Sequence, residues 1–238
     1  MTLDELIEAA HQGVRETQYV VGIFYENGIG VAIDKSVAEH WFQKSAQNGF
    51  AAAQYELSLL LQSKDEQNPG EAVDWLRKSA LQGFPLAQYL YSLYCEEGVG
   101  MAPDPKEALR VCLLAASSNY LPAARRAASM LEQGIGAAVD LEQAFSWYCR
   151  AAALGDADAA ASLGRMYANG LGVGKDEEKA LQWLEEGRKR ESPWALLALS
   201  SVYRFGELGK SIDTSKADEL AKQAQSLIER RAKRGTAS

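Results

Sequence analysis

The chain has 238 residues, of which 47% are hydrophobic and 24% are charged, as in an ordinary soluble protein. Its formal net charge is −7 and no basic stripe runs along a predicted helix, which argues against nonspecific binding of nucleic acid. No apolar run approaches the roughly 18 residues of a membrane span, and the residues after Met1 lack the basic region and apolar core of a secretory signal.

The first predicted element is a short helix within residues 1–12. Thr2 and Glu5 have the spacing of a capping box, in which each side chain accepts a hydrogen bond from the backbone N–H of the other residue. The apolar residues that follow share one helical face: Leu3, Leu6, Ile7 and Ala10. We expect this helix to cover the end of a stack of further helices.

From residue 13 onward the chain repeats itself with a period of 36 residues, shortened to 34 in one repeat. A Gly-x-Gly turn recurs as Gly28-Ile29-Gly30, Gly98-Val99-Gly100, Gly134-Ile135-Gly136 and Gly170-Leu171-Gly172. A second series of turn residues keeps the same step: Gly13, Gly49, Gly83, Asn119, Gly155 and Glu191. Self-similarity at such a period is the signature of a solenoid.

Each period is interpreted as two helices joined by tight turns, as the fifth repeat illustrates. Residues 157–167 place large side chains three or four positions apart, which is helical spacing. Gly170 can end this helix because glycine adopts the left-handed conformation at little cost. The acidic run that starts at Asp176 favours a second helix, whose apolar stripe contains Ala180 and Trp183. No repeat can bury such a stripe alone, so neighbouring repeats must stack.

The repeating unit resembles the Sel-one-like repeat, a relative of the tetratricopeptide repeat. In the first repeat the resemblance is carried by Gly22, Tyr25, Gly28, Gly30, Val31, Asp34, Ala38, Trp41, Phe42, Lys44, Ala46 and Gly49. In the second it is carried by Ala53, Gln54, Tyr55, Leu57, Ala72, Trp75, Lys78, Ala80 and Gly83. The second repeat lacks the Gly-x-Gly turn and is expected to have a polar loop over residues 63–70 instead. The resemblance covers roughly residues 3–225 and is weakest in the sixth repeat.

The resemblance implies an all-α fold: an α/α right-handed superhelix of helix-turn-helix repeats of about 36 residues. We predict a single repeat domain over residues 1–238. Its predicted parts are a capping helix at 1–12, repeats at 13–48, 49–82, 83–118, 119–154 and 155–190, and residues 191–238 as a sixth repeat with a C-terminal capping helix. Residues 216–234 are expected to form one long helix, with 236–238 frayed.

The repeated tryptophans Trp41, Trp75, Trp147 and Trp183 are predicted to fill gaps between helices, because a recurring position indicates packing before ligand binding. Trp194 departs from this register and is expected to be more exposed. The family resemblance also implies that the first helix of each repeat lines a concave groove that binds a peptide or partner protein.

The groove positions give two different surfaces. Repeats one to three supply an aromatic, apolar and acidic set: Tyr19, Ile23, Glu26, Asn27, Tyr55, Glu56, Leu59, Gln62, Tyr89, Leu90, Leu93, Glu96 and Glu97. Repeats four to six supply a more basic set: Arg125, Arg126, Ser129, Glu132, Gln133, Arg165, Asn169 and Arg204. The alternative is that the tyrosines are part-buried packing residues and that the charges form a solvated face.

Motifs of catalysis are missing from the sequence. Gly-x-Ser-x-Gly and Ser-x-x-Lys do not occur. The two histidines and three cysteines lack metal-ligand spacing, so no metal site or cofactor is predicted. The odd cysteine count, without the paired cysteines of some secreted relatives, favours reduced thiols and a cytoplasmic location.

We therefore expect a non-catalytic adaptor, monomeric, with a protein or peptide partner and no nucleic acid. The alternative is a secreted-type hydrolase or a sensor of a small anionic ligand, in which Arg125, Arg126 and Arg165 would hold a phosphate or carboxylate.

Overall fold

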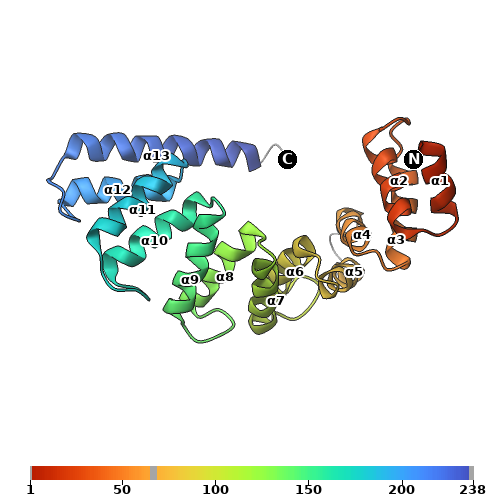
Figure 1. Ribbon diagram of the computed structural model, residues 1–238, viewed down its shortest axis with the longest axis horizontal. Helices are drawn as coiled ribbons and strands as arrows, with labels where there is room; N and C mark the ends of the chain where they lie inside the picture. The colour runs from red at the N-terminus through yellow and green to blue at the C-terminus, as the bar shows by residue number, and fades with distance from the viewer. Residues whose placement is uncertain (1, 65–68, 236–238) are drawn as a thin grey trace. The chain divides into compact units, whose positions relative to one another are not determined.

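The computed structural model describes residues 2–64 and 69–235, which form 13 α-helices and no strand (Figure 1). The all-α prediction is confirmed. The helices are α1 (Leu3–His11), α2 (Arg15–Asn27), α3 (Lys35–Gln47), α4 (Ala51–Lys64), α5 (Gly70–Leu81), α6 (Pro85–Glu97), α7 (Pro105–Ser117), α8 (Leu121–Gln133), α9 (Leu141–Ala153), α10 (Ala157–Asn169), α11 (Glu177–Lys189), α12 (Pro193–Phe205) and α13 (Thr214–Gly235). Residues 65–68 of the predicted loop and the predicted frayed end at 236–238 lie outside the described residues.

The helices fall into two compact units, Met1–Tyr120 with α1 to α7 and Leu121–Ser238 with α8 to α13. We call these the N-terminal unit and the C-terminal unit. In both, even-numbered helices are the first helices of the repeats and odd-numbered helices are the second helices. Each first helix packs against the second helix that follows it. The exception is α1, which is a second helix without a first one before it.

The helix ends follow the local sequence signals. The predicted capping box at Thr2 and Glu5 is present, with both reciprocal hydrogen bonds formed. Left-handed glycines end four first helices: Gly28, Gly98, Gly170 and Gly206. Aspartates begin four second helices by accepting hydrogen bonds from backbone N–H groups: Asp34, Asp104, Asp140 and Asp176. These signals act within one turn of helix, which is why the sequence alone predicts them.

The main filler of each second helix is not the repeated tryptophan but the residue after it. These following residues are all buried: Phe42, Leu76, Cys112, Tyr148 and Leu184. Trp41 is also buried, whereas Trp75, Trp147 and Trp183 are only half-buried. Trp75 packs against the cluster of Ala46, Ala53 and Leu57 as predicted, but these three tryptophans are less deeply buried than the residue that follows each of them.

The basic residue three positions after the repeated tryptophan contacts the indole ring, whether that ring is buried, as in Trp41, or half-buried. A cation lies over the indole ring in three repeats: Lys44 over Trp41 at 5.1 Å, Lys78 over Trp75 at 3.8 Å, and Arg150 over Trp147 at 4.6 Å. A cation above an indole face contributes about 0.5–1 kcal/mol at an exposed site. The tryptophan thus covers the outer edge of the helix pair while its neighbour fills the core.

Buried glutamines connect successive repeats of the N-terminal unit. Gln18, Gln54 and Gln88 each donate from Nε2 to the carbonyl of an alanine in the preceding second helix. Asn48 and Gln82 in turn donate to the Oε1 atoms of Gln18 and Gln54. In the C-terminal unit alanine and leucine stand at the glutamine position, so this polar ladder belongs to the N-terminal unit.

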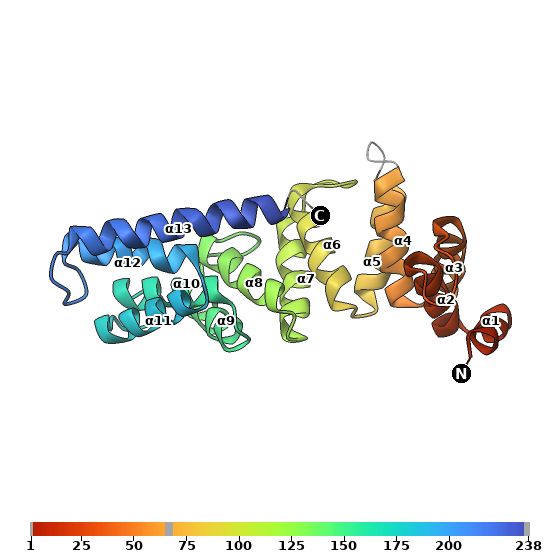
Figure 2. The same cartoon turned by 90° about the horizontal axis from the view of Figure 1, so that it is seen from above.

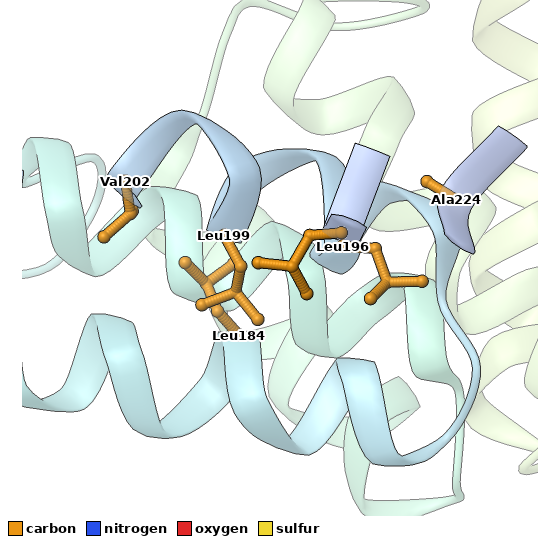
Figure 3. Close-up of a cluster of buried hydrophobic side chains, with 6 residues drawn as sticks. Leu184, Leu196, Leu199, Val202 and Ala224 are labelled. Carbon is orange, nitrogen blue, oxygen red and sulfur yellow. The ribbon is translucent and has the colours of Figure 1, made fainter. Parts of the chain in front are cut away.

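The C-terminal unit ends in an apolar cluster between α11, α12 and α13. Leu184, Leu196, Leu199 and Val202 converge there (Figure 3), together with Leu220 and Ala224 from α13. Both views of the fold show the long helix α13, predicted over 216–234, lying along α12 (Figures 1 and 2). Its apolar face buries one side of α12, which also packs against α10 and α11.

Candidate functional site

The predicted groove tyrosines of the N-terminal unit contact the next repeat. Each ring lies close to the aromatic residue that directly follows the next turn residue. The ring centroids are 5.2 Å apart for Tyr19 and Phe50, 5.6 Å for Tyr55 and Phe84, and 5.5 Å for Tyr89 and Tyr120. Such tilted ring pairs stabilise by about 0.5–1.5 kcal/mol beyond the area that they bury. These contacts agree with the alternative in which Tyr19, Tyr55 and Tyr89 are part-buried packing residues.

The other groove candidates of the N-terminal unit are mostly half-buried. They are Ile23, Glu26, Glu56, Leu59, Leu93 and Glu96. Leu59 and Gln62 line a cavity of about 370 Å³ together with Ser63, Pro69 and Val99. Burial, with Glu26 nearby, raises the pKa of Glu56. Among the described residues no cation is paired with Glu56, so its ionised carboxylate destabilises the folded state.

The predicted basic surface of the C-terminal unit consists of arginines that are already paired with carboxylates. The pairs are Arg125–Asp156 at 2.9 Å, Arg165–Glu132, and Arg204–Asp218 at 2.6 Å. Arg125 stands where Tyr19, Tyr55 and Tyr89 stand in the earlier repeats, and Asp156 stands where their aromatic partners stand. One repeat contact has therefore changed from an aromatic pair to an ion pair.

In two of these pairs the carboxylate lies deep and the guanidinium lies outside it, whereas Asp218 is more exposed than Arg204, at 71% against 42%. The side chains of Asp156 and Glu132 are 7% and 17% exposed, whereas those of Arg125 and Arg165 are 46% and 45% exposed. A third pair has the same order, with Arg231 of α13 46% exposed and Asp158 17% exposed. A ligand that approaches this surface meets the cations first, and each guanidinium has N–H donors beyond those used in its ion pair.

Glu132 accepts a second hydrogen bond in addition to the one from Arg165. The Tyr148 hydroxyl donates to its Oε2 atom at 3.0 Å, while Arg165 donates to its Oε1 atom. Burial and the adjacent Glu132 carboxylate raise the pKa of Tyr148 to about 12. Arg165 is therefore positioned by the Glu132 carboxylate, which is itself fixed by the hydrogen bond from the Tyr148 hydroxyl.

Two adjoining cavities lie along the face between α10 and α12. The Trp194 cavity, of about 410 Å³, is lined by Arg125, Ser129, Tyr148, Asp158, Ala161, Ser162, Arg165, Trp194 and Ala198. The Leu208 cavity, of about 560 Å³, is lined by Gly164, Arg165, Ala168, Asn169, Lys175, Glu177, Leu184, Ala198, Ser201, Val202, Gly206, Glu207, Leu208 and Gly209. Because they share Arg165 and Ala198, the cavities form one groove, which we call the α10–α12 groove.

Of the eight residues predicted for the C-terminal surface, four line the groove and four, among them Glu132 and Gln133, do not. Arg125, Ser129, Arg165 and Asn169 line it. Arg126 is half-buried and does not line either cavity, and Arg204 is engaged with α13 through Asp218.

Trp194 is the groove residue that the site prediction missed. Its side chain is 57% exposed on α12, whereas Leu196 and Leu199 on the same helix are buried. The signal that could have found it was present, because Trp194 is the one tryptophan outside the repeating register. Leu208 was not predictable, because it lies in a turn that departs from the repeat pattern.

The described residues contain no group of three or more histidine, cysteine or acidic side chains placed to hold a metal ion. Cys95 and Cys112 are buried free thiols, and Cys149 is half-buried. None of the helices over these residues is long and apolar enough to span a membrane.

Comparison with known proteins identifies the repeats. The family model described as Sel1 repeat matches residues 15–50, 51–84, 85–120, 121–156 and 157–190. A solved Sel1 repeat protein from Oxalobacter formigenes is 30% identical, with a TM-score of 0.74 over 94% of this chain and 88% of that one. The structure of c5321, a protective antigen of uropathogenic Escherichia coli with an SLR fold, is 28% identical, with a TM-score of 0.83 over 95% of this chain.

Two of these similar proteins are longer than this chain. The chain spans 49% of the c5321 structure. Chitin synthase regulatory factor 3 of Schizosaccharomyces pombe is 44% identical over 50 residues, which are 21% of this chain and 5% of that protein.

Proposed function

Because the chain belongs to the Sel1 repeat family, whose members are generally scaffolds for protein–protein interaction, we propose that it is a non-catalytic adaptor that holds a segment of a partner protein in the α10–α12 groove. The proposed binding region is thereby smaller than the predicted concave groove and lies within the C-terminal unit.

The observation that carries this proposal is the exposed Trp194 at the rim of a groove bordered by half-exposed arginines. Tryptophan and arginine are the residue types enriched where interface binding energy concentrates. The Trp194 indole is 57% exposed, so much of its apolar surface lies in water. Its contact with a partner would remove that apolar surface from water.

The alternative of a small anionic ligand is less well supported. Arg125 and Arg165 are each paired with a carboxylate, so the net charge offered to a free anion is small. A peptide segment can add apolar contacts with Trp194 and with the floor of the Leu208 cavity. An anion held by charge alone would not use either.

The test is recovery of a partner from cells of the source organism with tagged variants of the full chain. Trp194→Ala should lose the partner, because loss of an interface anchor costs about 2 kcal/mol or more, roughly a 30-fold change in affinity. Phe205→Ala is the matched control, since Phe205 is a 65% exposed aromatic on the same helix that does not line either cavity. Both variants should keep the wild-type melting temperature.

A second pair of variants tests the charges. Arg125→Glu/Arg165→Glu should also lose the partner. Arg15→Glu/Arg110→Glu makes the same charge change at two exposed ion pairs of the N-terminal unit and should keep it. If the Trp194 and Arg125/Arg165 variants recover the partner as well as wild type, the α10–α12 groove is not the binding site.

A further inference from the structure

The Trp194 cavity lies where the repeat no longer supplies its aromatic pair. In repeats one to three, two rings meet at the contact with the next repeat, as Tyr19 and Phe50 do at 5.2 Å. In the fifth repeat the same two places in the sequence hold Ala161 and Ser192. The short Ala161 side chain lines the Trp194 cavity. The cavity therefore adjoins the position from which a tyrosine ring projects in repeats one to three.

The polar side chains that line this cavity already have partners within the chain. Their partners are Asp156 for Arg125, Glu132 for both Arg165 and Tyr148, Gln133 for Ser129, the Asp158 backbone carbonyl for Ser162, and both Ser192 and Arg231 for the Asp158 carboxylate. Each charged group of the lining is thus neutralised by a residue of the protein itself. Charge complementarity at this cavity consequently favours an uncharged occupant.

The rest of the lining is apolar. The Trp194 indole is 57% exposed, and the methyl groups of Ala161 and Ala198 lie beside it in the cavity wall. The volume of about 410 Å³ falls within the roughly 300–1,000 Å³ of sites that bind small organic groups. A large apolar side chain that enters this cavity would remove the exposed indole surface from water.

The paired arginines favour an aromatic ring over an aliphatic group. A guanidinium that donates N–H bonds to a carboxylate still has two flat faces, and such faces stack on aromatic rings. The side chains of Arg125 and Arg165 are 46% and 45% exposed, so part of each remains accessible. The chain makes a contact of this kind elsewhere, with Arg150 over the Trp147 ring at 4.6 Å.

From these features we propose that the partner segment carries an aromatic residue whose ring enters the Trp194 cavity and contacts the Trp194 indole and the guanidinium groups of Arg125 and Arg165. The partner ring supplies from outside the aromatic contact that repeats one to three build from their own residues. This inference rests on the proposed function and specifies the chemistry of the partner.

The experiment is selection of random heptapeptides displayed on phage against the immobilised full chain. Wild-type protein should enrich peptides that contain Phe, Tyr or Trp. Ala161→Tyr restores the tyrosine of the earlier repeats at the cavity and should lose this enrichment. Ala198→Leu narrows the same cavity from a half-buried position and should lose it too. The control Ala153→Tyr adds the same ring at an exposed position of α9 that does not line the cavity, and it should enrich the same peptides as wild type.

Affinity measurements then test whether the ring itself is recognised. With a fluorescein-labelled peptide from the wild-type selection, changing its aromatic residue to Ala should weaken binding about 30-fold, as expected for an interface anchor. Changing it to cyclohexylalanine keeps the size and the apolar surface but removes the aromatic faces, and should weaken binding about two- to tenfold. Equal affinity of the cyclohexyl peptide would overturn the assignment of an aromatic occupant.

Fluorine NMR of the protein labelled with 5-fluorotryptophan locates the bound ring. The chain has five tryptophans, and the Trp194→Phe variant identifies the signal of Trp194. The selected peptide should shift this signal and leave the signals of the other four in place. A shift confined to another tryptophan would show that the ring binds elsewhere and would overturn the inference.

The outcomes separate this inference from the proposed function. Enriched peptides without an aromatic residue, the same enrichment by Ala161→Tyr and Ala198→Leu as by wild type, or no enrichment at all overturn the inference. Loss of the cellular partner in Trp194→Ala would still support the adaptor function in each of these cases. If Trp194→Ala keeps the partner, the adaptor function of this groove fails whatever the peptides show.

Discussion

At the scale of single residues, two glycines of one turn differ sharply in what they tolerate. Gly172 has a φ of +65°, and a Cβ atom there would overlap the backbone carbonyl of Leu141. Gly174 has no positive φ and nothing within 4 Å of the same added atom. Gly172→Ala should therefore destabilise by about 2 kcal/mol or more through strain and overlap. Gly174→Ala should be close to neutral. Urea unfolding of both variants checks this, and equal stabilities would contradict the turn geometry.

The half-buried Glu56 should make stability depend on pH. Its raised pKa means that the folded state favours the protonated carboxyl, so the ionised form destabilises the fold at neutral pH. This penalty is absent below the ordinary carboxyl pKa and grows as the pH rises through the raised pKa of the folded state. Glu56→Gln should therefore raise the melting temperature at pH 7, and the gain should vanish near pH 3.

The matched change for this test is Glu97→Gln at an exposed position on α6. It should leave the melting temperature unchanged at both pH values. A pH-independent gain in Glu56→Gln would show that the amide stabilises by packing and not by removing charge.

At the scale of the helix, the position after the tryptophan should dominate stability. Leu76→Ala removes a side chain that is 0% exposed and should cost about 2–5 kcal/mol. Trp75→Ala removes a half-buried ring and its contact with Lys78, and should cost less despite the larger side chain. Thermal unfolding of the two variants gives the order. A larger loss in Trp75→Ala would restore the tryptophan as the main filler of the helix pair.

The first helices carry the difference between the two units. In the N-terminal unit Tyr89 meets Tyr120, and one repeat later Arg125 meets Asp156 at the same place. The side-chain contact at this place thus changes from an aromatic pair to an ion pair with an exposed guanidinium. Specificity in this protein is therefore expected from first-helix positions that the repeat pattern leaves variable.

At the scale of the whole molecule, the charge is divided unequally. The N-terminal unit has eight lysines and arginines against 16 acidic residues, a net charge of −8. The C-terminal unit has 17 against 16, a net charge of +1, which together give the −7 of the chain. The negative charge of the chain is therefore carried by the N-terminal unit.

The two units should also respond separately to destabilisation, because repeats make their contacts with sequence neighbours. Leu76→Ala should speed amide hydrogen exchange mainly in the N-terminal unit. Leu199→Ala, at a fully buried position of α12, should do so mainly in the C-terminal unit. Exchange measured by mass spectrometry on both variants checks this, and uniform loss of protection along the chain from either one would mean that the described units unfold together.

The sequence by itself determined the period, the helices and their ends. Capping residues such as Asp176 and left-handed glycines such as Gly170 act within one helical turn, so their effect is readable locally. The long helix α13 and the capping box at Thr2 were predictable for the same reason.

Only the tertiary structure decided which groove residues come together and which are already occupied. Arg125 and Arg165 have partners 31 and 33 residues away, a separation at which sequence spacing gives no geometry. The burial of Leu76 rather than Trp75 depends on the angle at which two helices pack, which the 36-residue period leaves free. The exposure of Trp194 could be suspected from its register, but its position beside Arg125 and Arg165 follows from the stacking of α8, α10 and α12.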